Sequence, residues 1–436
     1  MPPAGEVTFA GAKHVSVDKD ISPPKPLLLI GIHGSPDHYA SAPKEILEYS
    51  RHFSIHIVCS NAREPAYDWP SEITVERVGL NLPYGRRPLW ASAAGWPDYL
   101  IFLKTLDNRI ARLKPGVVYC YDSPAFVAAS FIRRYRDFRL VYHCYDQWEP
   151  ERQSRFSLRR RLDLRAFREG PRAALVIYPE PARATYYMKR SGDRRPPTIL
   201  PNYPKLDLMP PIEDFDSLIE RRFARQELLY TGVISSTVAL PETIRALAEI
   251  KARLRILGVE NTETRRQLGE LARHLSLEER VSFSGWIPHR EMIARTMDAT
   301  IGLALHKPVS LNLTELVSAS NKLWEYAARG IPAVVPDTPN YRSKLTGEEW
   351  VAFADLNDPG SIARALRWFL DDRERYARAC RAARQAFEDR YNFESVAPKV
   401  IERLLSLAHP VPSNRESVSG SPVETPGPAN EPLPRG

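Results

Sequence analysis

The sequence predicts an α/β protein built from two doubly wound parallel sheets. Short apolar runs alternate with amphipathic stretches over residues 27–200, and the same alternation restarts near Leu228. The chain has 436 residues, more than the size at which a single hydrophobic core stops growing. We therefore expect two domains of the same type, with ligands bound in the cleft between them, beside the carboxyl ends of the strands.

The first expected domain covers residues 26–201, after a polar, proline-bearing lead at residues 1–25 that we expect to be disordered. Its strands are apolar and open into loops with glycine or polar residues, and its helices have one apolar face. The expected strands are 27–32, 55–59, 117–121, 140–145 and 175–178, and the expected helices are 42–49, 99–113 and 181–188.

The second expected domain covers residues 202–392 and begins with a linker, residues 202–226, that is rich in proline and acids. Expected strands lie near Leu228, Leu254, Val281, Thr300, Ala333 and Val351, and expected helices lie near Glu242, Arg265, Arg290, Lys322 and Ile362. Residues 409–436 contain seven prolines and few apolar residues, so we expect a disordered tail.

Composition restricts the cellular setting. The four cysteines, Cys59, Cys120, Cys144 and Cys380, lie far apart without a Cys-x-x-Cys pair, which favours a reducing compartment over a disulfide framework. No signal-like start and no membrane-length apolar run is present, so we expect a cytoplasmic, soluble or peripheral protein.

The net charge of +8 is concentrated near one expected helix. Seven arginines fall between residues 152 and 168, while Leu158, Leu162 and Ala166 recur every four residues. This pattern is typical of a solvated helix of an α/β domain, and it also permits weak contact with an anionic membrane surface. No nucleic-acid-binding module accompanies the arginines, so nucleic acid is not an expected partner.

A polar helix start within residues 320–332 predicts an anion site. Ser320 can cap the first turn, and Gly330 can end the helix in the left-handed conformation. Lys322 in the first turn opposes the helix dipole, unless an anion binds there and meets the free amides. A diphosphate would fit, and the Glu325 carboxylate can accept the two hydroxyls of a ribose. The alternative is a solvated helix start in which Lys322 and Glu325 pair with each other.

The same segment resembles the donor-binding signature of retaining, family-4-like glycosyltransferases (glycosyl transferases group 1), whose GT-B architecture has two Rossmann-like domains. Further motifs follow the order and spacing of that family, namely Leu229-Tyr230-Thr231-Gly232, Val281 to Pro288 and the Pro201-Asn202 turn at the hinge. The resemblance runs from about residue 26 to about residue 408 and implies a GT-B fold, in which a terminal helix at residues 393–408 packs back onto the first domain.

The resemblance implies a nucleotide-sugar donor site in the second domain. Lys322 and the amides of the helix start would hold the leaving diphosphate, Glu325 would position the ribose, and the backbone at Trp286 and Ile287 would read the base. The residues with an implied donor-binding role are Gly232, Trp286, Ile287, Ser320, Asn321, Lys322, Leu323 and Glu325.

In the first domain, the segment after the strand at 140–145 resembles the strand-end motif in which the family has a His followed by Asp. Here Tyr145 holds the His position, while His143 lies two residues earlier and Asp146 follows. Asp146 is the candidate for orienting the acceptor, and His143 is either catalytic or a hydrogen-bonded core histidine. Gly31 and Gly34 are candidates for close approach of the backbone to substrate.

Two departures from the family pattern stand out. Val317 occupies the position of a first glutamate, and the nearest carboxylate is Glu315. The stretch 236–239, around Val238, lacks the basic residue that usually grips the diphosphate. His306 and Lys307, at the end of the strand near Thr300, are candidates to replace that charge from another loop.

The resemblance implies transfer of a sugar from a nucleoside diphosphate donor to a cytoplasmic saccharide or lipid-linked saccharide acceptor, in polysaccharide or glycolipid assembly, with retention of configuration. We expect no cofactor and no metal, because no His/Cys cluster has ligand spacing and Asp214-Phe215-Asp216 lies in the linker. The alternatives are a nucleotide-sugar epimerase or a phosphorylase on the same fold, and a degenerate subunit that binds nucleotide or docks a partner without catalysis.

Overall fold

The computed structural model describes residues 24–38, 41–60, 67–79, 91–146, 149–208, 211–258, 262–285, 287 and 289–408. Almost all of the predicted lead at residues 1–25 and all of the predicted tail at 409–436 lie outside these ranges. Within the described part of the chain, every helix is too short or too polar to span a bilayer.

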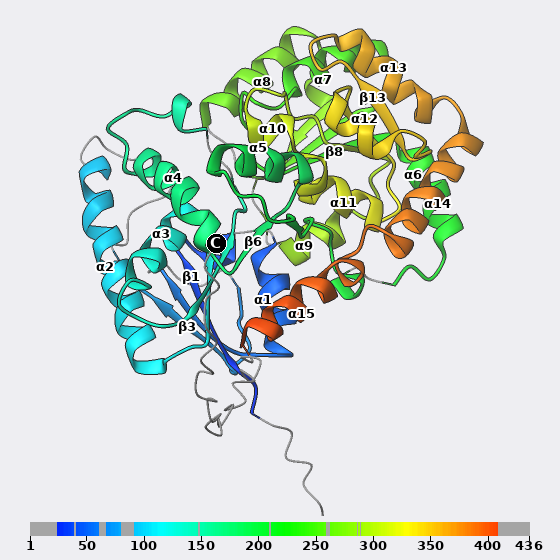
Figure 1. Ribbon diagram of the computed structural model, residues 1–436. Coiled ribbons are helices and arrows are strands. Elements are labelled where there is room, and N and C mark those ends of the chain that lie inside the picture. The colour runs from blue at the N-terminus through cyan, green and yellow to red at the C-terminus, as the bar shows by residue number, and fades with distance from the viewer. Residues whose placement is uncertain are drawn as a thin grey trace, which may run out of the picture.

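Each half of the chain forms one parallel sheet, as predicted (Figure 1). The first sheet has the order β3-β2-β1-β4-β5-β6-β7 and the second has the order β10-β9-β8-β11-β12-β13. The first sheet consists of β1 (Leu27–Ile32), β2 (Ser54–Cys59), β3 (Ile73–Arg77), β4 (Val117–Tyr121), β5 (Arg139–His143), β6 (Leu175–Tyr178) and β7 (Thr198–Ile199). The second consists of β8 (Glu227–Thr231), β9 (Arg253–Leu257), β10 (Val281–Phe283), β11 (Ile301–Leu303), β12 (Ala333–Pro336) and β13 (Val351–Ala354).

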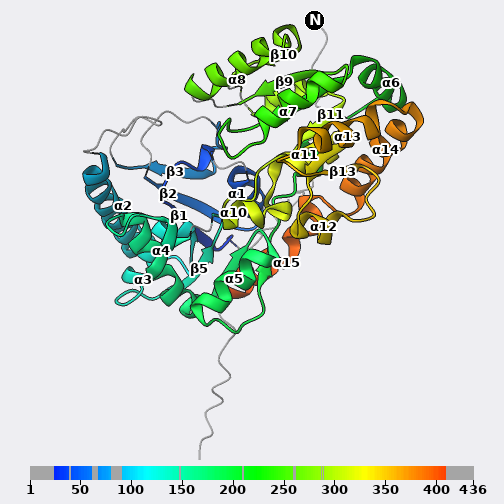
Figure 2. The same cartoon turned by 90° about the horizontal axis from the view of Figure 1, so that it is seen from above.

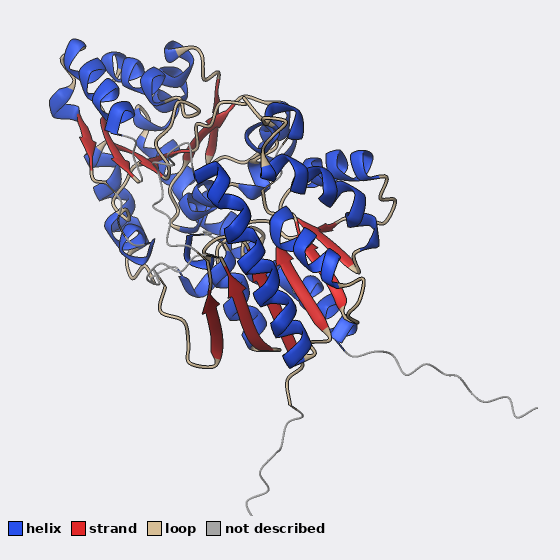
Figure 3. Cartoon of the chain, turned by 90° about the vertical axis from the view of Figure 1, so that its left-hand side faces the viewer, coloured by secondary structure: helices blue, strands red, loops and turns tan. Residues whose placement is uncertain are grey.

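Helices cover both sheets (Figure 3), and the two lobes lie beside each other when seen from above (Figure 2). The first half contributes α1 (Ala42–Ser50), α2 (Ala91–Leu113), α3 (Asp122–Ile132), α4 (Leu158–Glu169) and α5 (Pro181–Ser191). The second contributes α6 (Phe215–Arg225), α7 (Leu240–Ala246), α8 (Thr262–His274), α9 (His289–Arg295), α10 (Leu311–Thr314), α11 (Asn321–Ala328), α12 (Pro339–Leu345), α13 (Pro359–Leu370), α14 (Arg373–Asp389) and α15 (Ala397–Ala408).

The last helix, α15, belongs in space to the first sheet (Figure 1). Val400, Ile401 and Leu404 lie in the same hydrophobic cluster as Leu28 of β1 and Val117 of β4. The chain therefore crosses between the lobes twice, and burial of this helix ties its carboxyl end to the first sheet.

Three local expectations were wrong. The segment 202–226 is not all linker, because α6 occupies most of its second half; Asp214 caps that helix by accepting the Ser217 amide at 2.9 Å, and Ile219 is buried. Strand β3 was missed because apolar and polar residues alternate along it, at the edge of the sheet, and do not form a continuous apolar run. The expected strand at 140–145 ends at His143, where the chain turns.

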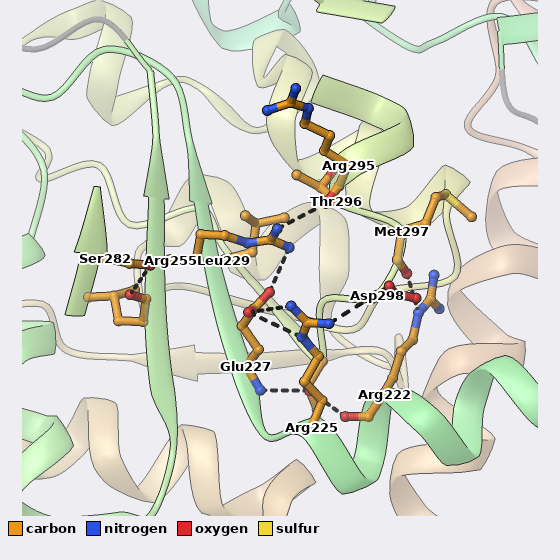
Figure 4. A network of polar contacts seen from close by, with 12 residues as sticks. Arg222, Arg225, Glu227, Leu229, Arg255, Ser282, Arg295, Thr296, Met297 and Asp298 are labelled. Atoms are coloured by element: carbon orange, nitrogen blue, oxygen red, sulfur yellow. Dashed lines mark hydrogen bonds and ion pairs between the residues drawn. The ribbon is translucent and has the colours of Figure 1, made fainter. Parts of the chain in front are cut away.

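The start of β8 is fixed by a network of three arginines, of which Arg222 is buried (Figure 4). The Arg222 guanidinium is fully buried and donates to the carbonyls of Met297, Arg329 and Gly330 at 2.7–3.0 Å. The ion pairs of this network are Arg225–Glu227, Arg225–Asp298 and Arg255–Glu227. These contacts lie at the amino end of β8, away from the edge where a doubly wound sheet binds ligands, so the network is structural.

Candidate active site

Helix α11 is held against the second sheet by one tyrosine. The Tyr326 hydroxyl donates to the Leu229 carbonyl at 3.1 Å and accepts from the Thr231 amide at 3.2 Å. A Cβ atom on Gly302 of β11 would overlap the Tyr326 ring, so glycine there is a packing requirement. The first turn of α11 is thereby set beside the carboxyl end of β8.

The Lys322 ammonium lies in the turn that follows β8. Its Nζ atom is 3.1 Å from the Tyr230 hydroxyl, 2.9 Å from His306 Nε2 and 4.2 Å from the centre of the Tyr230 ring. A Cβ on Gly232, whose φ is +126°, would lie 3.2 Å from Nζ. Burial lowers the pKa of Lys322 to about 7, although Glu325 raises it. The hydrogen-bond partners of Lys322 are thus the uncharged Tyr230 hydroxyl and the His306 ring, as expected for a cation that binds an anion.

The loops after β8 and β11 pair with each other. Val238 and His306 form an antiparallel bridge, and the Lys307 amide donates to the Thr237 carbonyl at 2.8 Å. The Lys307 ammonium lies 2.8 Å from Glu242, so its charge is already matched. Of the two candidate replacements for the missing basic residue, only His306 contacts Lys322.

The other predicted residues of the helix start lie close by. Glu325 is buried, and the Asn321 side-chain oxygen accepts from the Ser41 hydroxyl of the first lobe at 2.8 Å. Leu323 is fully buried in the core. Ser320 occupies the cap position of α11, but its side chain makes no capping hydrogen bond, so the expected cap is wrong in that detail.

Asp146 lies where the two lobes meet. The Asp122 carboxylate accepts the Asp146 amide at 2.8 Å, which fixes the turn after β5. The Arg183 guanidinium, whose pKa is lowered by burial and raised by Asp146, donates to the Asn312 carbonyl at 2.6 Å and to that of Glu315 at 2.7 Å. Burial also raises the pKa of the Glu315 carboxyl. The structure therefore brings Asp146 and Glu315 to the same interface.

His143 lies in the core of the first lobe. Its side chain has no exposed surface; Nδ1 is 2.8 Å from the Tyr119 hydroxyl and 3.4 Å from the Glu45 carboxylate. Strand β5 ends at His143 and directs the side chain of this residue toward Glu45 of α1. Its geometry is that of the hydrogen-bonded core histidine.

The remaining predicted positions are spread over three loops and strands. Gly31 lies inside β1, paired with Val58 and Cys120, and Gly34 follows in the next turn. Ile287 is partly buried against the core of the second lobe, and Trp286 lies outside the described residues.

Sequence reasoning did not single out Lys44 or Arg183. Lys44 of α1 donates to the Tyr203 carbonyl at 2.6 Å, and burial lowers its pKa to about 8 while Glu45, Glu325 and Glu394 raise it. Its place near Glu325 comes from the approach of the two lobes, for which the sequence around residue 44 holds no local signal.

A cavity of about 290 Å³ lies elsewhere, on the first lobe. Its charged lining is formed by Arg133, Arg134, Arg172 and Glu169. Glu169 already pairs with Arg172 at 3.0 Å, and Ser130 and Leu140 complete the lining. Among the described residues, no three His, Cys, Asp or Glu side chains gather as a metal site.

Comparison with known proteins agrees with this geometry. Residues 239–402 match the family model described as glycosyl transferase-like. No curated protein sequence matches the chain significantly.

Solved structures share the arrangement of both lobes. Sucrose-phosphate synthase from Thermosynechococcus elongatus has a TM-score of 0.69 at 16% identity, covering 88% of this chain and 100% of that one. Anabaena HepE in complex with UDP has a TM-score of 0.64 at 16% identity, with coverages of 87% and 100%. A putative UDP-N-acetylglucosamine 2-epimerase from Listeria monocytogenes has a TM-score of 0.56 at 12% identity, with coverages of 87% and 96%. At these identities the likeness shows a GT-B fold, which hosts more than one reaction.

The environment of Lys322 predicts a dependence of stability on pH. With a folded-state pKa of about 7, below that of lysine in an unfolded chain, the unfolded state binds more protons between about pH 7 and pH 10. The free energy of unfolding therefore rises with pH in this window. Lys322→Met removes both the buried charge and this rise, so the ligand-free variant should exceed wild type in stability most near pH 7.

Urea unfolding of both proteins at about pH 7 and about pH 9 checks this expectation, with the exposed Lys251→Met as the matched control. A stability difference between Lys322→Met and wild type that is the same at both pH values would contradict the assigned environment.

Proposed function

We propose that the chain, which has a GT-B fold and matches a glycosyl transferase-like family model over residues 239–402, is a group 1 glycosyltransferase. It would transfer a sugar from a nucleoside diphosphate donor, with retention of configuration, to a saccharide or lipid-linked saccharide. The observation that carries the proposal is the Lys322 ammonium, hydrogen-bonded to the neutral Tyr230 and His306 at the first turn of α11. A diphosphate is the anion that the size and charge of this place favour.

The same groups would assist departure of the diphosphate. Negative charge grows on the leaving oxygen as the glycosidic bond breaks, and Lys322 with the free amides at the start of α11 stabilises that charge. A bound diphosphate also favours the protonated lysine, so the low pKa of the empty site does not prevent this role.

The donor base and ribose are proposed from position. Glu325 lies one turn after Lys322 and would accept the ribose hydroxyls, and the backbone near Ile287 would meet the base. UDP is the first nucleotide to test, because HepE was solved with UDP and with UDP-glucose.

The acceptor would bind from the side of the first lobe. Asp146, at the meeting of the lobes, would orient the acceptor hydroxyl toward the sugar. No metal or cofactor takes part in the proposed reaction, since Lys322 and the helix amides supply the positive field, and the proposed setting is cytoplasmic polysaccharide or glycolipid assembly.

Stereochemistry tests the reaction. With UDP-glucose and a saccharide acceptor, the product should keep the donor's anomeric configuration in its proton NMR spectrum, and a chelator should leave the rate unchanged. Asp146→Asn should lower kcat more than the affinity for UDP, while Asp216→Asn, on the surface, should change neither. An inverted anomer, or activity restored only by a divalent ion, would overturn the proposal; donor binding without release of UDP would support the non-catalytic subunit.

A membrane surface is the proposed partner of the first lobe. Large apolar side chains are exposed on α2, namely Trp96, Leu100 and Ile101, and just before α4, where Phe156 lies. Arg161 lies over the Trp96 ring at 6.0 Å and Arg155 over the Phe156 ring at 5.1 Å. Arg159 instead pairs with Asp163, so part of the basic face expected from the sequence is matched within α4. Aromatic and arginine side chains together suit the interface of an anionic bilayer.

Vesicle co-sedimentation tests this contact. Binding to anionic vesicles should fall with salt, because exposed charges are screened over about 8 Å at physiological ionic strength. The binding that remains at high salt should depend on the aromatic rings of Trp96 and Phe156. Trp96→Ala with Phe156→Ala should remove that residual, whereas Trp368→Ala, 52% exposed on α13 of the other lobe, should not. Absence of sedimentation at low salt would leave α4 as an ordinary solvated helix.

A further inference from the structure

The imidazole of His306 stands beside the loop that lacks a basic residue. Residues 236–239 carry no cationic side chain, and the bridge between Val238 and His306 holds the two loops together. The backbone bonds on either side of the bridge, Lys307 to Thr237 and Ala239 to Leu305, fix its register. The backbone bridge therefore fixes the position of His306 relative to residues 236–239.

The hydrogen-bond inventory of His306 is incomplete. Lys322 Nζ lies 2.9 Å from Nε2. When Lys322 is an ammonium, which has no lone pair, Nε2 is the acceptor. The ring proton of the neutral imidazole is then on Nδ1, which is buried and has no partner among the described residues. A buried donor without a partner costs free energy, and here it adjoins a cation. The lone pair that faces Lys322 is therefore the one on Nε2.

Among the described residues, no carboxylate forms a hydrogen bond with Lys322 or His306. Lys322 comes from α11, with Glu325 one turn later, and the Tyr230 hydroxyl comes from β8. Lys307, next to His306, is matched by Glu242 of α7. Burial, followed by the charge of Lys322, holds the pKa of His306 well below its usual range. Without a bound anion, Lys322 and His306 are therefore not both protonated.

We propose that a diphosphate bound at Lys322 draws one proton from solvent onto His306, which then supplies the positive charge that residues 236–239 lack. The ammonium turns from Nε2 to a phosphate oxygen, Nε2 takes the solvent proton, and the imidazolium donates to the diphosphate. His306 gains one N–H bond and one positive charge, and no bond between heavier atoms forms or breaks. The inference rests on the diphosphate site of the proposed function and assigns His306 as a positioning and charge-bearing residue of that site.

Ring ¹⁵N NMR of the full-length protein tests the proposal, with inorganic pyrophosphate and UDP as separate probes. His306→Gln, which can donate a hydrogen bond but cannot take a proton, identifies the ring signals. At about pH 7 the ring should be neutral in the empty protein and imidazolium at saturation with either probe. The exposed His274 of α8 should not change, and His274→Gln is the matched control.

Calorimetry supplies a second readout. Wild-type affinity for pyrophosphate should rise as pH falls from about 8 to about 6.5, with one more proton taken up than in His306→Gln, and the variant should bind about 10-fold more weakly near pH 7. Pyrophosphate bound through Lys322 while the His306 ring stays neutral would overturn the inference, as would equal proton uptake in the two proteins.

The two proposals can fail separately. If pyrophosphate binding protonates His306 but UDP binds no more tightly than pyrophosphate, the proposed charge on His306 is supported and the nucleotide donor is contradicted. Tight UDP binding with a neutral His306 ring would support the nucleotide donor and contradict the proposed charge on His306. If neither probe binds, both proposals fall.

Discussion

The contact between Tyr326 and the backbone of β8 determines where the chemistry of this chain lies. A single hydroxyl satisfies the Leu229 carbonyl and the Thr231 amide, and it reaches them only because Gly302 has no side chain. Helix α11 is thereby fixed in rotation as well as in position, so Lys322 in its first turn enters the Gly232 turn. The two turns that end β8 and β9 also approach closely, since a Cβ on Gly258 would overlap the Gly232 carbonyl.

The second lobe meets the first through polar contacts around the same helix. Ser41 donates to Asn321, the Ser318 amide donates to the buried Glu180 at 2.7 Å, and Arg183 holds the carbonyls beside Glu315. Charged and amide side chains thus satisfy backbone groups that would otherwise be buried without partners. The segment before α11 is consequently ordered by both lobes, which brings the proposed donor-side and acceptor-side residues to one interface.

Local pattern was enough for much of this account. The strands β1, β4 and β6 were predicted to the residue because they are buried on both faces and so read as unbroken apolar runs. The same kind of pattern predicts an anion site at Lys322, because a cation in a first helical turn is unfavourable without an anion.

What failed depended on contacts that sequence spacing does not encode. Whether His143 faced the interface or the core was decided by where β5 stops, and the pairing of Lys307 with Glu242 required two loops to meet. The contact of His306 with Lys322 arose from the bridge between His306 and Val238. A long polar segment hid α6, whose buried face is only partly apolar because Arg222 lies on it.

Calorimetric titration of UDP and of uridine into wild type, Lys322→Met and the exposed control Lys251→Met tests the central claim, that the Lys322 ammonium is the anion-binding group. Loss of a charge-assisted hydrogen bond should weaken UDP binding by about 10- to 100-fold in Lys322→Met and leave uridine binding unchanged. The control should match wild type with both ligands. UDP binding as tight in Lys322→Met as in wild type would contradict the account.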